Sequence, residues 1–158
     1  MKTKGSMIEE LHQVPGAIPF HEKSALVITL DDMHMPIGTM SSFVISNYPN
    51  LYDLVKTPKA SYMLDRGSIG VVKISGPFTD KYAAVYGVIL HRVTSPHASN
   101  NAVYIKKTLD VLHEKILYDK LSRVIMPRIG VECGLNWTGV VKPIIEKTFC
   151  DMNVSISY

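Results

Sequence analysis

The chain has 158 residues, 46% of them apolar, and a formal net charge of +3 at pH 7. This size and apolar content suit one hydrophobic core, so we expect a single domain over residues 1–158. The lysines and arginines form no dense basic run with interleaved aromatic residues, so nucleic acid is not an expected partner. No stretch approaches the roughly 20 apolar residues that cross a bilayer, so no membrane association is expected.

The two cysteines, Cys133 and Cys150, have neither the spacing of metal ligands nor the density of a secreted disulfide framework. We therefore expect reduced thiols and a cytoplasmic location. No bound metal and no cofactor are expected.

Five runs rich in β-branched or aromatic residues predict strands. They span residues 24–30, 70–75, 82–93, 123–126 and 152–158. Several of them lack polar alternation, which is typical of strands inside a sheet. Gly76 and Pro77 form a tight connection between the second and third runs, so these two strands are expected to be antiparallel neighbours.

Three segments with helical periodicity lie between the strands, over residues 38–47, about 100–121 and 137–149. The second carries an apolar stripe at helical spacing: Ile105, Leu109, Leu112 and Ile116. The third carries a similar stripe: Trp137, Val140, Val141, Ile144, Ile145 and Phe149. Asn136 precedes it as an N-cap. Alternating strands and helices predict a three-layer α/β fold, a mixed central sheet with helices on both faces.

In open sheets of this kind, ligands bind beyond the carboxyl ends of strands, where helix N-termini present free N–H groups to phosphate. Two segments have this position: residues 31–42 (DDMHMPIGTMSS) follow one predicted strand, and residues 129–137 (IGVECGLNW) follow another. Both loops leave the same edge of the sheet, so we expect them to line one cleft. The expected lining residues are Asp31, Gly38, Thr39, Gly130, Cys133, Gly134, Leu135 and Asn136.

Residues 126–149, MPRIGVECGLNWTGVVKPIIEKTF, resemble the diphosphate loop and final helix of macro domains. The similar branch contains the terminal ADP-ribose glycohydrolase and the yeast-type ADP-ribose 1″-phosphate phosphatase. Shared features are MPRIG leaving a strand, a CGL step, a Trp at the helix start, and Pro-Ile-Ile-Glu with an aromatic at the helix end. Ser6 and Met7 match an element near the adenine, with Ser6 in place of the family's Asp or Asn. Residues 26–49 and 82–93 extend the resemblance over nearly the whole chain.

The resemblance implies the macro-domain fold and recognition of ADP-ribose, a derivative of it or an ADP-ribosylated protein. Asp31 stands where the family has an Asn near the distal ribose, and residues 37–41 keep one glycine of the family's glycine-rich turn. Arg92 and Asn136 occupy the positions of the glycohydrolase branch's catalytic Lys and Asp, and Ile28 that of a His in phosphatase-like members. Because Arg stays protonated and Asn cannot accept a proton as a base, the usual mechanisms lack their residues.

Asp31, Asp32 and His34 form a tight cluster of titratable side chains beside the expected cleft. Asp31 or His34 could act as the catalytic base, the cluster could coordinate a cation, or the loop could simply be solvated. Arg92 could pair with a phosphate or lie in solvent at a strand end. Cys133 is not expected to be a nucleophile, because no partner His is placed beside it.

Gly130 and Gly134 could let backbone N–H groups hold a diphosphate or could serve only the turn, and Asn136 could orient a ribose hydroxyl or only cap the helix. The predicted ligand contacts are Ser6, Met7, Gly38, Thr39, Arg92, Gly130, Val131, Cys133, Gly134, Leu135 and Asn136. Three functions stay open: a hydrolase of an ADP-ribose derivative, an inactive ADP-ribose-binding module, and a partner-binding protein that keeps only the fold. By analogy, a small macro domain with a diverged loop suits a phage or viral accessory protein.

Overall fold

The computed structural model describes residues 8–11, 21–31, 35–47, 71–74, 82–90 and 101–157. Its strands are β1 (Ile8–Leu11), β2 (His21–Asp31), β3 (Val71–Ile74), β4 (Tyr82–Leu90), β5 (Arg123–Pro127) and β6 (Asn153–Ser157). Its helices are α1 (Gly38–Asn47), α4 (Ala102–Tyr118) and α5 (Lys142–Thr148), with the short helical turns η4 (Val131–Cys133) and η5 (Trp137–Val141). Within these ranges, no helix combines the length and hydropathy needed to span a bilayer.

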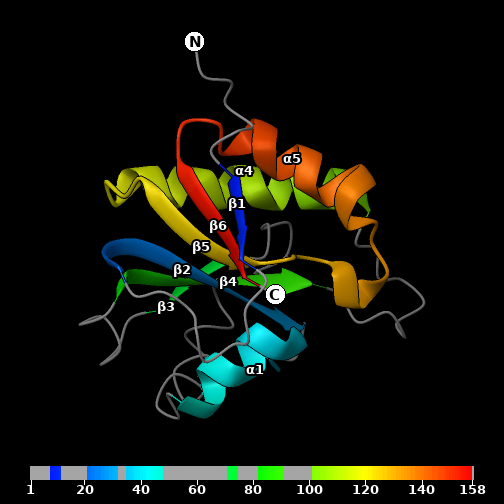
Figure 1. Cartoon of the computed structure of the whole chain (residues 1–158), viewed down its shortest axis with the longest axis horizontal. Helices are drawn as coiled ribbons and strands as arrows, with labels where there is room; N and C mark the ends of the chain where they lie inside the picture. The colour runs from blue at the N-terminus through cyan, green and yellow to red at the C-terminus, as the bar shows by residue number, and fades with distance from the viewer. Residues whose placement is uncertain are drawn as a thin grey trace.

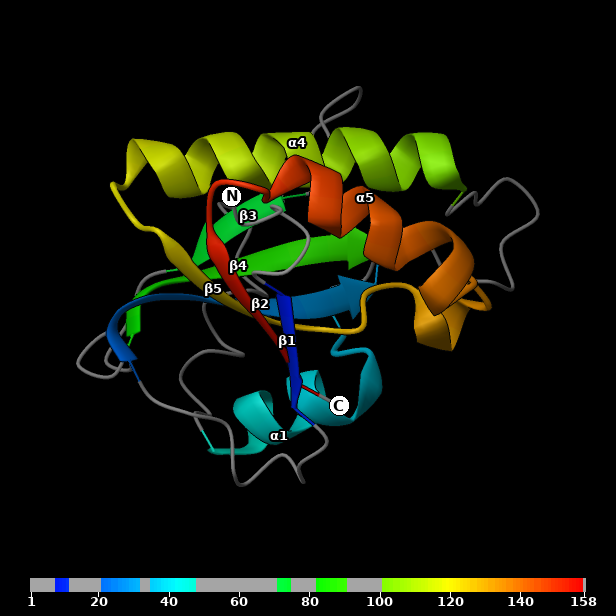
Figure 2. The same cartoon turned by 45° about the horizontal axis from the view of Figure 1, so that its top comes forward.

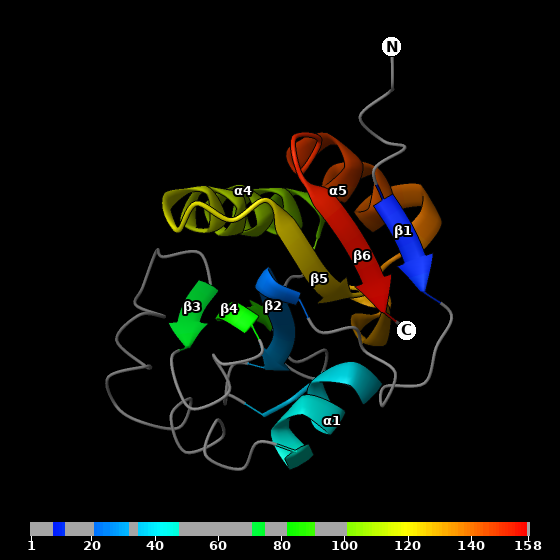
Figure 3. The same ribbon diagram turned by 60° about the vertical axis from the view of Figure 1, so that its left-hand side comes forward.

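The described strands form one six-stranded sheet in the order β1-β6-β5-β2-β4-β3. All neighbouring pairs are parallel except β3 and β4, which are antiparallel. Figures 1 and 2 show α4 and α5 side by side over one face of the sheet, and Figure 3 shows α1 on the opposite face. The predicted three-layer α/β fold with a mixed sheet is therefore confirmed, as is the antiparallel pair.

Most predicted elements have nearly the predicted bounds. The first helix occupies the predicted residues 38–47, whereas the long helix is shorter at both ends than predicted, at Ala102–Tyr118. The last helical segment begins with the wider π-helical turn η5 before α5. The predicted connection at Gly76 and Pro77 lies outside the described residues.

The strand β1 was not predicted, because its sequence IEEL has no run of β-branched residues. It forms through parallel pairing at the sheet edge, with Ile8 opposite Val154 and Leu11 opposite Ser157 of β6. Tertiary pairing therefore outweighs local propensity in this strand.

A hydrophobic cluster lies between the sheet and the layer of α4 and α5. The predicted stripe of α4 is buried throughout, with Ile105 at 1% exposure and Leu109, Leu112 and Ile116 at 0%. The prediction for the last stripe is only partly right. Val141, Ile145 and Phe149 are buried, whereas Trp137, Val140 and Ile144 are partly buried at the margin of the core.

A hydrogen bond ties the end of α4 to the sheet. The hydroxyl of Tyr86, which is fully buried on β4, donates to Oδ2 of Asp119 at the C-cap of α4. Burial, followed by the hydrogen bond to Asp119 and its charge, raises the pKa of Tyr86 well above its usual value. The phenol therefore remains a neutral donor and holds the last turn of α4 over β4.

We expect Tyr86→Phe to lower the free energy of unfolding by about 1.5–3 kcal/mol, because a hydrogen bond to a charged acceptor is lost. Urea denaturation at pH 7 measures this loss. Tyr118→Phe is the matched control, since Tyr118 is 86% exposed, and it should change the stability by less than about 0.5 kcal/mol. Equal losses in the two variants would contradict the anchoring role of Tyr86.

Candidate functional site

The connections of the sheet reverse direction between β2 and β5, near its centre. After β2 the chain continues through α1 to β3 at one edge, whereas after β5 it continues through α5 to β6 on the other side. In open α/β sheets, a ligand crevice forms at such a point, beyond the carboxyl ends of the two strands. The two predicted loops begin here, at the ends of β2 and β5.

The pairing between β2 and β5 covers only three residues of β2, with Ser24 opposite Arg123 and Leu26 opposite Ile125. Beyond Leu26, β2 continues to Asp31 with β4 on one side and no β5 residue paired on the other. The free side of β2 is therefore open to another segment of the chain.

The chain after β2 folds back along this free side. The N–H of Asp31 donates to the carbonyl of Met35 at 2.8 Å, and that of Ile37 donates to the carbonyl of Thr29 at 2.9 Å. The N–H of Thr29 donates to Oγ of the buried Ser41 at 2.8 Å, and the Thr29 hydroxyl donates to the carbonyl of Ile37 at 2.8 Å. These bonds fix the first turn of α1 against the end of β2.

The carboxylate of Asp31, a predicted catalytic base, contributes to this turn. Asp31 is 8% exposed, and its Oδ1 accepts the N–H of Met35 at 2.9 Å. Together with the backbone bond between the same residues, this contact closes the turn after β2. Asp31 is thus a buried hydrogen-bond acceptor, held at the carboxyl end of β2.

Thr39 is exposed in the first turn of α1. Gly38 is the first residue of the same helix, and the remaining described ligand contacts lie in the second loop. The cluster members and ligand contacts outside the described residues are Ser6, Met7, Asp32, His34 and Arg92.

The second loop turns through η4 between two glycines in the left-handed region, Gly130 with φ 87° and Gly134 with φ 85°. The N–H of Leu135 donates to the carbonyl of Gly130 at 3.0 Å and closes the loop. A Cβ on Gly130 would lie 2.5 Å from Cδ1 of Leu135, whereas a Cβ on Gly134 would have nothing within 4 Å. Gly130 is required by both backbone and packing, while Gly134 borders open space.

The two loops meet at Gly38, the first residue of α1, which has a φ of 86°. A Cβ on Gly38 would lie 3.0 Å from both Cδ and Oε2 of Glu132. The loops that follow β2 and β5 therefore lie side by side. Glu132 was not among the predicted site residues, although it is the only charged residue between residues 129 and 137.

Asn136 caps the helical turn that follows the second loop. Its Oδ1 accepts the N–H of Gly139 at 2.9 Å, which confirms the predicted N-cap. Val131, Cys133 and Leu135 are partly buried, and Asn136 is exposed. The loop therefore has partly buried side chains on one side and an exposed side chain at Asn136.

Cys133 has a thiol with low nucleophilicity. Burial, followed by the charge of Glu132, raises the pKa of Cys133 above its usual value. A protonated thiol is a poor nucleophile at neutral pH. This agrees with the expectation that Cys133 is not a nucleophile.

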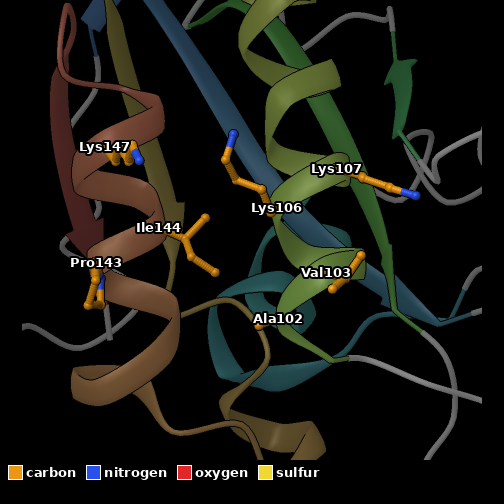
Figure 4. Close-up of a pocket in the computed structure, with 7 residues that line it drawn as sticks. All are labelled: Ala102, Val103, Lys106, Lys107, Pro143, Ile144 and Lys147. Atoms are coloured by element: carbon orange, nitrogen blue, oxygen red, sulfur yellow. The ribbon is translucent and has the colours of Figure 1, made fainter.

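A separate groove of about 510 Å³ lies between α4 and α5 (Figure 4). Its lining residues are Ala102, Val103, Lys106, Lys107, Pro143, Ile144 and Lys147. Lys106 in this groove pairs with Asp110 of the same helix at 2.6 Å. None of the predicted site residues lines the groove.

The strand order and the helices on both faces are those of the macrodomain fold, as the similarity to solved structures shows. The macrodomain of Mycobacterium tuberculosis DarG aligns with a TM-score of 0.73 at 17% identity, covering 95% of this chain and 96% of that one. The macrodomain of Thermus aquaticus DarG aligns with a TM-score of 0.70 at 18% identity, covering 96% and 97%. The Oceanobacillus iheyensis macrodomain with MES bound aligns with a TM-score of 0.72 at 11% identity, covering 95% and 82%.

No protein-family model matches the sequence, and neither does any curated protein. At identities of 11–18%, the similarity to solved structures establishes the fold. The macro-domain fold implied by the sequence resemblance is therefore confirmed.

We expect Gly134→Ala to destabilise the protein by about 1–2 kcal/mol, because an alanine is strained at positive φ. Gly130→Ala should cost about 2–5 kcal/mol, because the same strain is joined by overlap with Leu135. Urea denaturation of the two variants measures the difference. Equal losses would show that the contact between Gly130 and Leu135 does not constrain the loop.

Proposed function

We propose that this chain recognises ADP-ribose or a derivative of it in the crevice between the loops after β2 and β5. The observation that carries the proposal is the contact between Gly38 and Glu132, which joins a helix N-terminus to a glycine-rich turn at the switch point of the sheet. Backbone N–H groups of such turns and helix ends bind phosphate groups. The resemblance of residues 126–149 to a macro-domain diphosphate loop supports the same ligand.

Under this proposal, the diphosphate lies between the first turn of α1 and the η4 loop. Gly134 faces open space, so its backbone is accessible to a ligand from that side. Thr39 and Asn136 are exposed on the two loops and can contact the ligand's phosphate or ribose oxygens. By the resemblance, Ser6 and Met7 would contact the adenine, and the guanidinium of Arg92 could pair with a phosphate.

Isothermal titration calorimetry with ADP-ribose tests the proposal, with AMP and ribose 5-phosphate as half-ligands. ADP-ribose should bind at least about tenfold more tightly than either half, because it alone spans both sides of the diphosphate. If ADP-ribose does not bind, the chain has kept the fold without this ligand, and the alternative of a partner-binding protein takes its place.

We expect Gly134→Ala to weaken ADP-ribose binding by more than about tenfold, because a methyl group would enter the space that the diphosphate needs. Calorimetry at a temperature where the variant remains folded measures this change. Tyr86→Phe is the control. Its expected loss of stability is comparable, but it removes a hydrogen bond to the end of α4 and leaves the glycine loop unchanged. If the control loses as much affinity as Gly134→Ala, the effect reports stability and not contact with the ligand.

Hydrolysis of a derivative, such as ADP-ribose 1″-phosphate or an ADP-ribosylated group, is the enzymatic form of the proposal. Asp31 is the candidate base among the described residues, because its carboxylate lies at the carboxyl end of β2 beside the crevice. Its hydrogen bond with Met35 orients the carboxylate. His34, the second candidate, is nearby in the sequence.

Asp31→Asn separates the charge of this residue from its structural role. The amide oxygen still accepts the N–H of Met35, so we expect the turn and ADP-ribose affinity to be retained. Any hydrolysis should fall by about 10² to 10⁴, the usual effect of losing a general base. Phosphate-release and ADP-ribose-release assays measure it. Full turnover would place the base elsewhere, with His34 next to be tested, whereas ligand binding by the unmodified chain without turnover would define a binding module.

A further inference from the structure

Helix α1 begins at the edge of the crevice without an acidic side chain of its own. Its ten residues run from Gly38 to Asn47, and none in the first turn is acidic. The N-terminus of a helix carries a partial positive charge and attracts anions. An anion at this end of α1 must therefore come from another segment or from a ligand.

The η4 loop supplies such an anion. The carboxyl group of Glu132 lies against Gly38, with Cδ and Oε2 at 3.0 Å and Oε1 at 3.2 Å from where a Cβ would stand. Gly38 has no side chain, and the three heavy atoms nearest to where its Cβ would stand all belong to Glu132. The Glu132 carboxylate therefore occupies the space next to the N-terminus of α1.

We propose that Glu132 is a tethered anion that competes with the ligand's diphosphate for the N-terminus of α1; this rests on the proposed function. A phosphate and a carboxylate cannot share this small space, and their like charges repel. The ligand has to displace the side chain, and its apparent affinity falls in proportion to the fraction of molecules in which the site is free. Contacts on both sides of the diphosphate must compensate for this cost, so Glu132 disfavours small phosphate ions in the crevice.

Glu132 is able to move aside. Its side chain is exposed, and among the described residues it forms no hydrogen bond or ion pair. Its electrostatic effect on its neighbours is nevertheless present, since its charge contributes to the raised pKa of Cys133. Displacement therefore breaks no specific bond while it moves a negative charge away from the crevice.

The test compares ADP-ribose and inorganic pyrophosphate by calorimetry on the unmodified chain, Glu132→Gln and Glu132→Ala. Glu132→Gln removes the charge and keeps the size, and it should tighten ADP-ribose binding by about tenfold. Glu132→Ala, which also clears the space, should tighten it by at least as much. Pyrophosphate affinity should rise in the same direction. The gain in Glu132→Gln should shrink as the salt concentration rises from about 0.05 to about 0.5 M, because screening weakens the repulsion.

Glu114→Gln is the matched control, because it makes the same change in net charge. Glu114 is exposed on α4, which covers the opposite face of the sheet from α1 (Figure 3). Its affinity for both ligands should stay within about twofold of the unmodified chain. A tenfold gain in this control would mean that net charge, and not the position of Glu132, governs binding.

The thermal stability of the protein without ligand gives a second measurement, and it should change in the opposite direction to the affinity. A carboxylate near a helix N-terminus stabilises the helix, so without ligand Glu132→Gln should lower Tm by about 1–4 °C. A variant that is less stable but binds more tightly would support the competition.

Unchanged or weaker ADP-ribose binding in both Glu132 variants would overturn the proposed competition. Weaker binding would mean that the carboxylate contacts the ligand. Equal binding by all forms leaves the proposed function standing. Binding by none of them removes the proposed function together with this inference.

Discussion

The pairing of β2 with β5 ends at Leu26, and the crevice depends on how the remaining backbone groups of β2 are satisfied. Buried N–H and carbonyl groups without partners are costly, so a strand that continues past its neighbour needs another source of hydrogen bonds. Here the chain after β2 provides them, because Thr29 bonds to Ile37 through its carbonyl and to Ser41 through its N–H. The same bonds orient α1, so the position of the helix N-terminus follows from saturating the edge of β2.

Elements with a strong local pattern could be predicted from the sequence, and elements that depend on tertiary pairing could not. The stripe of α4 and the cap at Asn136 are encoded within a few residues, and the structure has both. The strand β1 has no such pattern and exists because β6 pairs with it. Trp137, Val140 and Ile144 follow the same helical spacing as their buried neighbours, but they lie at the margin of the core, and spacing alone does not distinguish these two positions.

The candidate site likewise combines features that the sequence predicts with features that it does not. The spacing and the resemblance predict the two loops and their glycines, since both features are written in short motifs. The contact between Gly38 and Glu132 joins parts of the chain that are far apart in the sequence, so no short motif encodes it. The structural role of Asp31 is a local turn, in which the carboxylate accepts the N–H of Met35 four residues later. A titratable residue beside a cleft is therefore an ambiguous signal until its hydrogen-bond partners are known.

The charges of the described loops constrain how any anion could be bound. Residues 35–47 contain no charged side chain, and residues 129–137 contain only the negative Glu132. Recognition of a phosphate by these two loops would therefore rest on backbone N–H groups, which require close approach to the main chain. Gly38, Gly130 and Gly134 all have positive φ, so a side chain at any of these positions would be strained. Under the proposed function, the backbone would supply the attraction and Glu132 the opposing charge, and the balance between these two terms would set which anions the two loops can hold.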